Sequence, residues 1–124
     1  MILVIDLEST CVPQEEKPDG YHGQIIEIGA AWVTLEGVVI DTFEAFVQAE
    51  NPVTAFCTEL TGITQKDADN GLPYPAAMQA LSAFAAKHPD GKVWGSWGNS
   101  DRNSFSNECS KHGVENPLEG WLHR

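Results

Sequence analysis

Two carboxylates near the amino terminus are the first residues whose types and spacing predict chemistry. Asp6 and Glu8 follow the apolar run Ile2–Ile5, and side chains two residues apart on a strand share one face. No Lys or Arg precedes Lys17, and two close carboxylates without a basic neighbour repel each other. Mg²⁺ relieves that repulsion and binds through one or two carboxylates, water and substrate phosphate. The alternative is that Asp6 only ends the strand and Glu8 begins a solvated loop.

Asp101 is the third candidate, because it lies in the first turn of a predicted helix for which Ser100 is the expected N-cap. The helix dipole stabilises a carboxylate there by ~0.3–1 kcal/mol, which could by itself explain the residue. If the predicted strand Gly91–Trp97 lies parallel to the predicted strand Met1–Leu7, however, their carboxyl ends adjoin. Asp101 would then face the first two carboxylates across one crevice.

The elements that must position these acids follow from the hydropathy pattern. The unbroken apolar run of the first strand predicts burial on both of its faces. A short turn after the second strand favours an antiparallel hairpin, and a helix between strands favours a crossover in a mixed sheet with helical cover. The predicted strands are Met1–Leu7, Gln24–Thr34, Val38–Gln48 and Gly91–Trp97, and the predicted helices are Thr54–Leu60, Thr64–Asn70, Pro75–His88 and a last one from Ser100 to Gly113.

Composition limits the class of protein. With 124 residues, 42% of them hydrophobic, the chain is long enough for one domain with a core. Nothing approaches the ~20 apolar residues of a membrane span, and three widely spaced cysteines favour reduced thiols, so we expect a cytoplasmic protein. The net charge of −11 argues against non-specific binding of nucleic acid. A polyanionic partner would have to be held by metal ions or by a local patch.

Three segments of the sequence resemble one known family. Residues 2–10 (ILVIDLEST), followed by a loop and QIIEIGAAWV, resemble the first exonuclease motif of the DEDD superfamily. Asn51-Pro52 and residues 56–64 (FCTELTGIT) resemble the subgroup that includes the histone-mRNA 3′-exonuclease and KapD-like proteins. Residues 94–101 (WGSWGNSD) are similar to the second exonuclease motif. The three segments occur in order and span most of residues 1–105.

The resemblance implies an α/β fold of the RNase H-like type, a mixed sheet with helices on both faces. It also implies 3′→5′ hydrolysis of single-stranded RNA or DNA to 5′-monophosphates with two Mg²⁺ or Mn²⁺ ions. One metal would generate hydroxide from water, and the other would stabilise the leaving 3′ oxygen. By this resemblance Asp6, Glu8 and Asp101 are metal ligands and catalytic residues.

The resemblance also implies residues that contact the substrate. In the family the loop after the first two acids helps to seat the terminal 3′ hydroxyl, which points to Ser9 and Thr10. An aromatic residue in the FCTELTGIT segment packs on a terminal base, which would be Phe56, and Trp97 could supply the opposing face. Base–aromatic stacking contributes ~1–3 kcal/mol per base. A position in the hydrophobic core is the alternative for both aromatic residues.

The sequence departs from the family at its third motif. In the DEDDh branch this motif supplies a His general base and, five residues later, the fourth Asp, but none of the four His residues here has an Asp at that spacing. We therefore expect a single exonuclease-like domain, residues 1–124, that lacks its C-terminal strand and helix. Loss of a general base alone typically lowers rates ~10²–10⁴-fold. The alternatives are a non-catalytic RNase H-like module that binds nucleic acid or protein, or a sheet completed by a partner chain.

Overall fold

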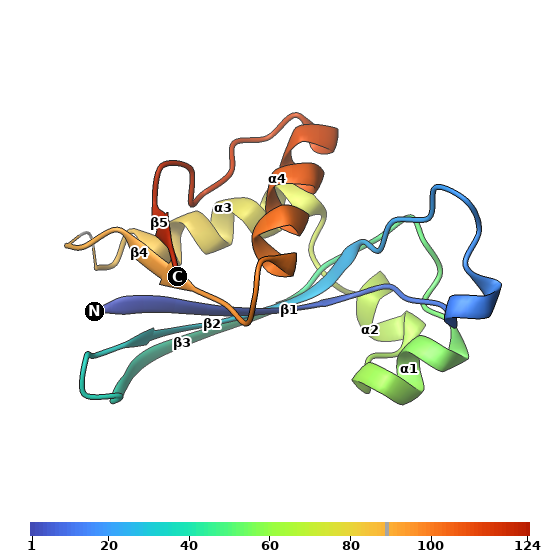
Figure 1. Cartoon of the computed structure of the whole chain (residues 1–124), viewed down its shortest axis with the longest axis horizontal. Coiled ribbons are helices and arrows are strands. Elements are labelled where there is room, and N and C mark those ends of the chain that lie inside the picture. Colours follow the sequence, from blue (N-terminus) through green and yellow to red (C-terminus); the bar gives the residue numbers. More distant parts are fainter. Residues whose placement is uncertain (89) are drawn as a thin grey trace.

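A five-stranded mixed sheet forms the centre of the molecule, of which the computed structural model describes residues 1–88 and 90–124 (Figure 1). The strand order is β3-β2-β1-β4-β5. The first three strands are antiparallel, β4 is parallel to β1, and β5 is parallel to β4. The strands are β1 (Ile2–Ser9), β2 (Ile25–Val33), β3 (Val39–Phe46), β4 (Val93–Gly95) and β5 (Leu122–His123). The predicted hairpin and the predicted parallel crossover are both confirmed.

Helices cover the sheet from two sides. Figure 1 shows α3 and α4 on one side of the strands, whereas α1 and α2 lie on the other side near the end of β1. The predicted α/β class, with a mixed sheet and helices on both faces, is confirmed. The helices are α1 (Ala55–Thr61), α2 (Gln65–Asp69), α3 (Tyr74–Ala85) and α4 (Ser100–His112), and a short 3₁₀ turn η1 (Gln14–Glu16) lies in the loop after β1.

The core explains why one face of β1 is available for a site. Leu3, Ile5 and Leu7 alternate along β1 and are buried in the hydrophobic cluster that α3 and α4 complete. Val4, between them, is 41% exposed. The prediction that this strand is covered on both faces was therefore wrong. The apolar run alternates after all, because α3 and α4 pack on only one face of β1.

Two boundaries differ from the prediction by one or two residues. β1 continues to Ser9, because Glu8 pairs with Glu27 on β2 before the register shifts. Helix α4 begins at Ser100, so Asn99 and not Ser100 is the N-cap, and the Asn99 side chain makes no capping hydrogen bond. The predicted N-cap was wrong by one position, and the first backbone N–H groups of α4 have no side-chain cap.

A fifth strand is present where the sequence analysis expected the chain to lack one. In β5, Leu122 pairs with Val93 and His123 pairs with Trp94. The backbone N–H of Leu122 donates to the carbonyl of Lys92 at 3.0 Å. A two-residue strand carries no periodicity that a sequence could reveal. Within the described part of the chain, no helix is long and apolar enough to cross a bilayer.

Truncation of a β1 side chain should depend on which face it occupies. Ile5→Ala should lower the free energy of unfolding by about 2–5 kcal/mol, because Ile5 is 1% exposed and its loss leaves a cavity. Val4→Ala, next to it on the open face, should cost less than about 1 kcal/mol. Urea denaturation of both variants checks this, and equal losses would contradict the one-sided packing of β1.

Candidate active site

Asp6 and Glu8 lie on the open face of β1. Both alternate with the buried residues of that strand, so their side chains project on the face opposite α3 and α4. Asp6 is exposed and Glu8 is partly buried. The cross-strand neighbour of Asp6 is Gly29, which leaves space above the strand. The predicted sharing of one face by the two acids is thus seen in the structure.

Asp101 reaches β1 through a gap that β4 leaves. β4 pairs with β1 only at Leu3 and Val4, so the edge of β1 beyond them has no strand partner on that side. The backbone N–H of Leu7 donates there to Oδ2 of Asp101 at 3.4 Å, across 94 residues of sequence. Leu7 stands between the first two acids. The structure therefore brings a late aspartate beside the two early acids, as the parallel strands predicted.

The three carboxylates influence one another electrostatically. Burial raises the pKa of the Glu8 carboxyl, and the charges of Asp6 and Asp101 raise it further. Burial also raises the pKa of Asp101, while the N–H of Leu7 and the nearby His123 act in the opposite direction. Both results describe carboxylates held close together, with His123 as the opposing charge at Asp101. Such a cluster favours either protons or a cation.

Two further acids extend this cluster, and sequence reasoning missed their place in it. Glu27 of β2 lies directly opposite Glu8, and Glu44 of β3 lies opposite Gly29. Burial raises the pKa of Glu27, and repulsion from Glu44 and Glu8 adds to the rise. The sequence suggested only a half-exposed polar position for Glu27, which agrees with its partial burial. Only the strand register shows that it faces Glu8.

The donor chemistry of the three predicted ligands suits Mg²⁺ or Mn²⁺, because hard divalent cations prefer carboxylate oxygens. None of the three is ion-paired among the described residues, whose two salt bridges join Lys87 to Asp41 and Lys111 to Glu50. The placement of the oxygens does not complete a cage. Within residues 1–88 and 90–124, no group of three or more His, Cys, Asp or Glu side chains is arranged to hold one ion. Asp6 and Glu8 flank Leu7 along β1 and Asp101 binds its N–H, but the three carboxylates do not surround one ion position.

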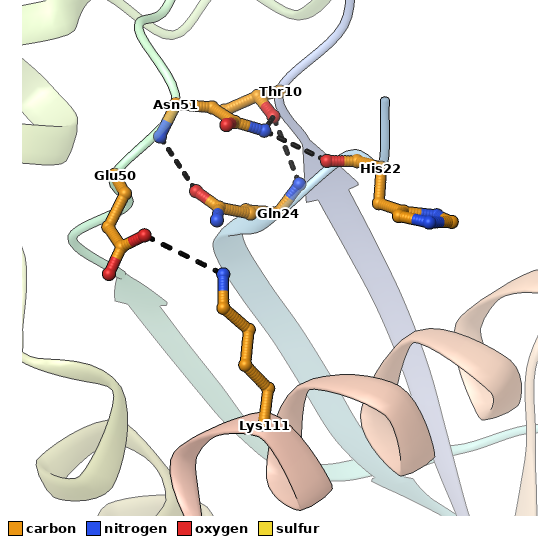
Figure 2. A network of polar contacts seen from close by, with 6 residues as sticks. All are labelled: Thr10, His22, Gln24, Glu50, Asn51 and Lys111. Atoms are coloured by element: carbon orange, nitrogen blue, oxygen red, sulfur yellow. Dashed lines mark hydrogen bonds and ion pairs between the residues drawn. The ribbon is translucent and has the colours of Figure 1, made fainter. Parts of the chain in front are cut away.

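Thr10, the residue directly after β1, is the centre of a hydrogen-bond network (Figure 2). Thr10 is 2% exposed, and its hydroxyl oxygen lies 2.9 Å from the backbone nitrogen of Gln24, 3.1 Å from Nδ2 of Asn51 and 3.2 Å from the hydroxyl of Tyr21. Nδ2 of Asn51 also donates to the carbonyl of His22 at 2.8 Å. Thr10 thus joins three segments of the chain. A direct contact with a substrate stays a prediction for Thr10 and for its neighbour Ser9.

The two predicted aromatic contacts lie outside the core. Trp97 is 97% exposed in the loop between β4 and α4, where Gly98 follows it with a φ of 78° that favours glycine. Phe56, in the first turn of α1, is 40% exposed. The core alternative is therefore wrong for Trp97, and Phe56 presents much of its ring to solvent. Stacking on a base stays a prediction for both rings.

His123 is a second feature that the sequence did not reveal. Its Nε2 lies 2.8 Å from Oγ of Ser96, at the end of β4, and its ring packs on Trp94 with centroids 4.4 Å apart. The hydroxyl of Ser96 also contacts the carbonyl of Gly98 at 3.1 Å, and a carbonyl can only accept. Ser96 therefore donates to Gly98 and accepts from Nε2–H of His123. This arrangement fixes the ring near Asp101.

Comparison with known proteins assigns the family. A family profile described as Exonuclease (RNase_T) matches residues 3–90, which is more than half of the chain. The chain belongs to this exonuclease family. The 3'-5' exonuclease Snipper of Drosophila melanogaster is 29% identical over 136 residues, with 94% of this chain and 48% of Snipper covered. ERI1 exoribonuclease 2 of Mus musculus is 42% identical over 92 residues, with 69% of this chain and 13% of that protein covered.

Solved structures extend the family assignment to the fold. The nuclease domain of 3'hExo, described as a DEDDh family member and bound to rAMP, superposes with a TM-score of 0.81 at 25% identity. That match covers 94% of this exonuclease-family chain and 61% of the solved one. The resemblance to DEDDh exonucleases and the RNase H-like fold are thereby confirmed. The chain spans less than half the length of the two curated relatives, 48% and 13%.

Because the Glu8 carboxylate is partly buried near other acids, its removal should raise the free energy of unfolding in a pH-dependent way. Without divalent cations, Glu8→Gln should unfold at higher urea than the wild type at about pH 7, because the charged group is buried among acids. The raised pKa means that the folded state holds this proton more tightly than the unfolded chain. The wild type therefore loses stability as pH rises from 4.5 to the raised pKa, and the difference between the proteins should vanish below pH 4.5.

Urea midpoints in EDTA on both sides of that window measure this effect. Glu36→Gln, at an exposed turn position, is the matched control and should leave the midpoint unchanged. A lower midpoint for Glu8→Gln than for the wild type at neutral pH would contradict the described electrostatics.

Proposed function

We propose that this chain is a metal-dependent 3′→5′ exonuclease domain that hydrolyses single-stranded RNA or DNA to 5′-monophosphates. The observation that carries the proposal is the bond between Asp101 and the N–H of Leu7, which brings the third acid beside Asp6 and Glu8. Membership of the exonuclease family supports the reaction class. Relatives named 3'-5' exonuclease and exoribonuclease support the direction and a nucleic-acid substrate.

In this proposal Asp6, Glu8 and Asp101 hold Mg²⁺ or Mn²⁺ and form the catalytic centre. Two such ions would activate water and stabilise the leaving oxygen of the scissile phosphate. The protein's own contribution is to hold three carboxylates together at the end of β1, where the β4 edge is open. Their mutual repulsion, seen in the raised pKa of Glu8, is the electrostatic reason for cation binding.

The proposed substrate is the 3′ end of a single strand, and the exposed rings of Trp97 and Phe56 are the proposed contacts for its bases. Trp97 lies four residues before Asp101, and Phe56 is in the first turn of α1, whose Cys57 belongs to the cluster that Cys11 packs against. We propose that the two rings stack on terminal bases. Ser9, whose carbonyl lies 3.6 Å from Sγ of Cys57 in α1, is the stronger candidate for the 3′ hydroxyl, because the Thr10 hydroxyl already serves the network of Figure 2.

The remaining expectations belong to the same proposal. Residues 1–124 would form a single exonuclease-like domain. A cytoplasmic location would agree with the three free cysteines, which form no disulfide among the described residues.

Metal binding gives the first test. Calorimetric titration with Mn²⁺ should show heat of binding for the wild type that Asp6→Asn abolishes or greatly reduces, since the variant removes one ligand charge. Asp19→Asn, an exposed loop acid with the same change of charge, is the control and should bind like the wild type. Release of 5′-monophosphates from a labelled single strand would then report the reaction. Equal heats from the wild type and Asp6→Asn, or products with 3′-phosphates, would contradict the proposal.

A second function is favoured by two specific observations. The described residues include no three-ligand metal group, and no His in the sequence has an Asp five residues later. A non-catalytic module that binds nucleic acid or protein through the same surface fits both. Metal-dependent shortening of a labelled strand by this chain would exclude it, whereas strand binding without any shortening would favour it.

Stacking on Trp97 predicts a loss that is specific to this ring. Trp97→Ala should weaken binding of a single strand by about 1–3 kcal/mol, because a base–aromatic contact is removed. Trp97→Phe keeps a ring and should restore most of the affinity. Since Trp97 is 97% exposed, neither change should alter the thermal midpoint. Fluorescence anisotropy measures the affinities, and unchanged binding by Trp97→Ala would refute the stacking role.

A further inference from the structure

Two hollows lie near the carboxylates, and their charges differ. One, of about 350 Å³ on the open face of the sheet, is lined by three acids, Asp6, Glu27 and Glu44. The other, of about 700 Å³, lies between residues 20–24 and α4, and we name it the α4 groove. A chain of phosphates is repelled by the first hollow unless cations neutralise it. The second offers a route without that repulsion.

The α4 groove is lined almost entirely by neutral hydrogen-bonding groups. Ser100, Asn103, Ser104 and Asn107 recur along one side of the helix at spacings of three and four residues, so they form a stripe. Glu108 is the acid of the lining, but it is 7% exposed and its Oε2 accepts from the backbone N–H of Ile25 at 2.8 Å. Its charge is thus directed away from the groove, into a backbone contact.

A cation stands at the far end of this stripe. Lys111 pairs with Glu50 at 3.6 Å, with their side chains 52% and 79% exposed, which describes a weak surface ion pair. Figure 2 shows Lys111 reaching from α4 toward the segment that carries Asn51. Its ammonium group remains accessible to a phosphate. In a chain of net charge −11, a groove whose lining has one accessible Lys and one acid repels phosphate less than the hollow lined by Asp6, Glu27 and Glu44 does.

The opposite wall of the groove is held in place by the network around Thr10. Oε1 of Gln24 accepts from the backbone N–H of Asn51 at 2.7 Å, and Nδ2 of Asn51 binds the carbonyl of His22. Gly23 passes so close to the backbone of Thr10 that a Cβ would lie 2.7 Å from its carbonyl oxygen. The wall at residues 20–24 is therefore preorganised, which lowers the ordering cost of a ligand.

From this geometry we propose that the α4 groove binds the sugar–phosphate backbone of a single strand on the 5′ side of the nucleotide at the carboxylates. The groove begins at Ser100, next to Asp101, and ends at Lys111, about 17 Å along the helix at ~1.5 Å per residue. Amide and hydroxyl groups contact phosphate and sugar oxygens without selecting a base. The inference rests on the proposed exonuclease function and adds the path of the strand to it.

Two charge-matched variants test the path. Asn103→Asp with Asn107→Asp places two acids in the groove, whereas Ser106→Asp with Ser110→Asp places two on another side of the same helix, where both serines are exposed. The ligands are a trinucleotide and a decanucleotide, in ribo and deoxyribo forms, with phosphorothioate linkages to slow hydrolysis in Mg²⁺, a hard ion that prefers oxygen ligands. Circular dichroism verifies that both variants fold.

The wild type should bind the decanucleotide at least about tenfold more tightly than the trinucleotide, because phosphate contacts beyond the terminal residues add affinity. The groove variant should lose most of that gain and keep its trinucleotide affinity, while the control variant should stay within about twofold of the wild type. Equal losses in both variants, or no loss in either, would overturn the path. A wild type without length dependence would overturn the groove alone, and binding of neither ligand would overturn the proposed function as well.

Discussion

The candidate site depends on the backbone N–H of Leu7, which has no partner in β4. Each N–H of a strand that points toward a neighbouring strand needs an acceptor, and β4 supplies none beyond Val4 because it ends after three residues. Asp101 provides that acceptor from the first turn of α4. The same bond that completes the edge of β1 therefore fixes a carboxylate beside Asp6 and Glu8. One hydrogen bond therefore both satisfies the β1 backbone and places the third acid of the candidate site.

The division of charge in the molecule follows from this arrangement. The three antiparallel strands place Glu27 and Glu44 on the same open face as Asp6, so acids accumulate where no helix covers the sheet. On the α4 side, Glu108 is the acid that lines the groove, and its Oε2 accepts a hydrogen bond from the backbone N–H of Ile25. The groove therefore carries fewer acids than the open face of the sheet, although the exposed Glu50 pairs with Lys111 at its far end. Its near end begins at the residue preceding Asp101.

The sequence predicted most of the helices and strands, but it did not predict the register in which the strands pair. Hydropathy predicted the hairpin, the helices within a few residues and the parallel placement of β4, and the motifs located the three acids. It did not show that Glu27 faces Glu8, because a shift of one residue in pairing would turn Glu27 to the other face. The burial of Thr10 depends on Gln24 and Asn51, which only the tertiary fold brings to its hydroxyl. Two-residue β5 has no sequence signal at all.

Protons and divalent cations must compete for the same oxygens in such a cluster. Burial and neighbouring acids raise the pKa of Glu8, Glu27 and Asp101, so each carboxyl holds a proton more tightly than an isolated one does. A metal ion bound as proposed would have to displace those protons, and its binding would therefore weaken as pH falls through the raised values. The N–H of Leu7 limits this effect at Asp101, since it stabilises the charged form there. The edge of β1 thus moderates the rise in pKa at Asp101, beside the two acids that the strand itself supplies.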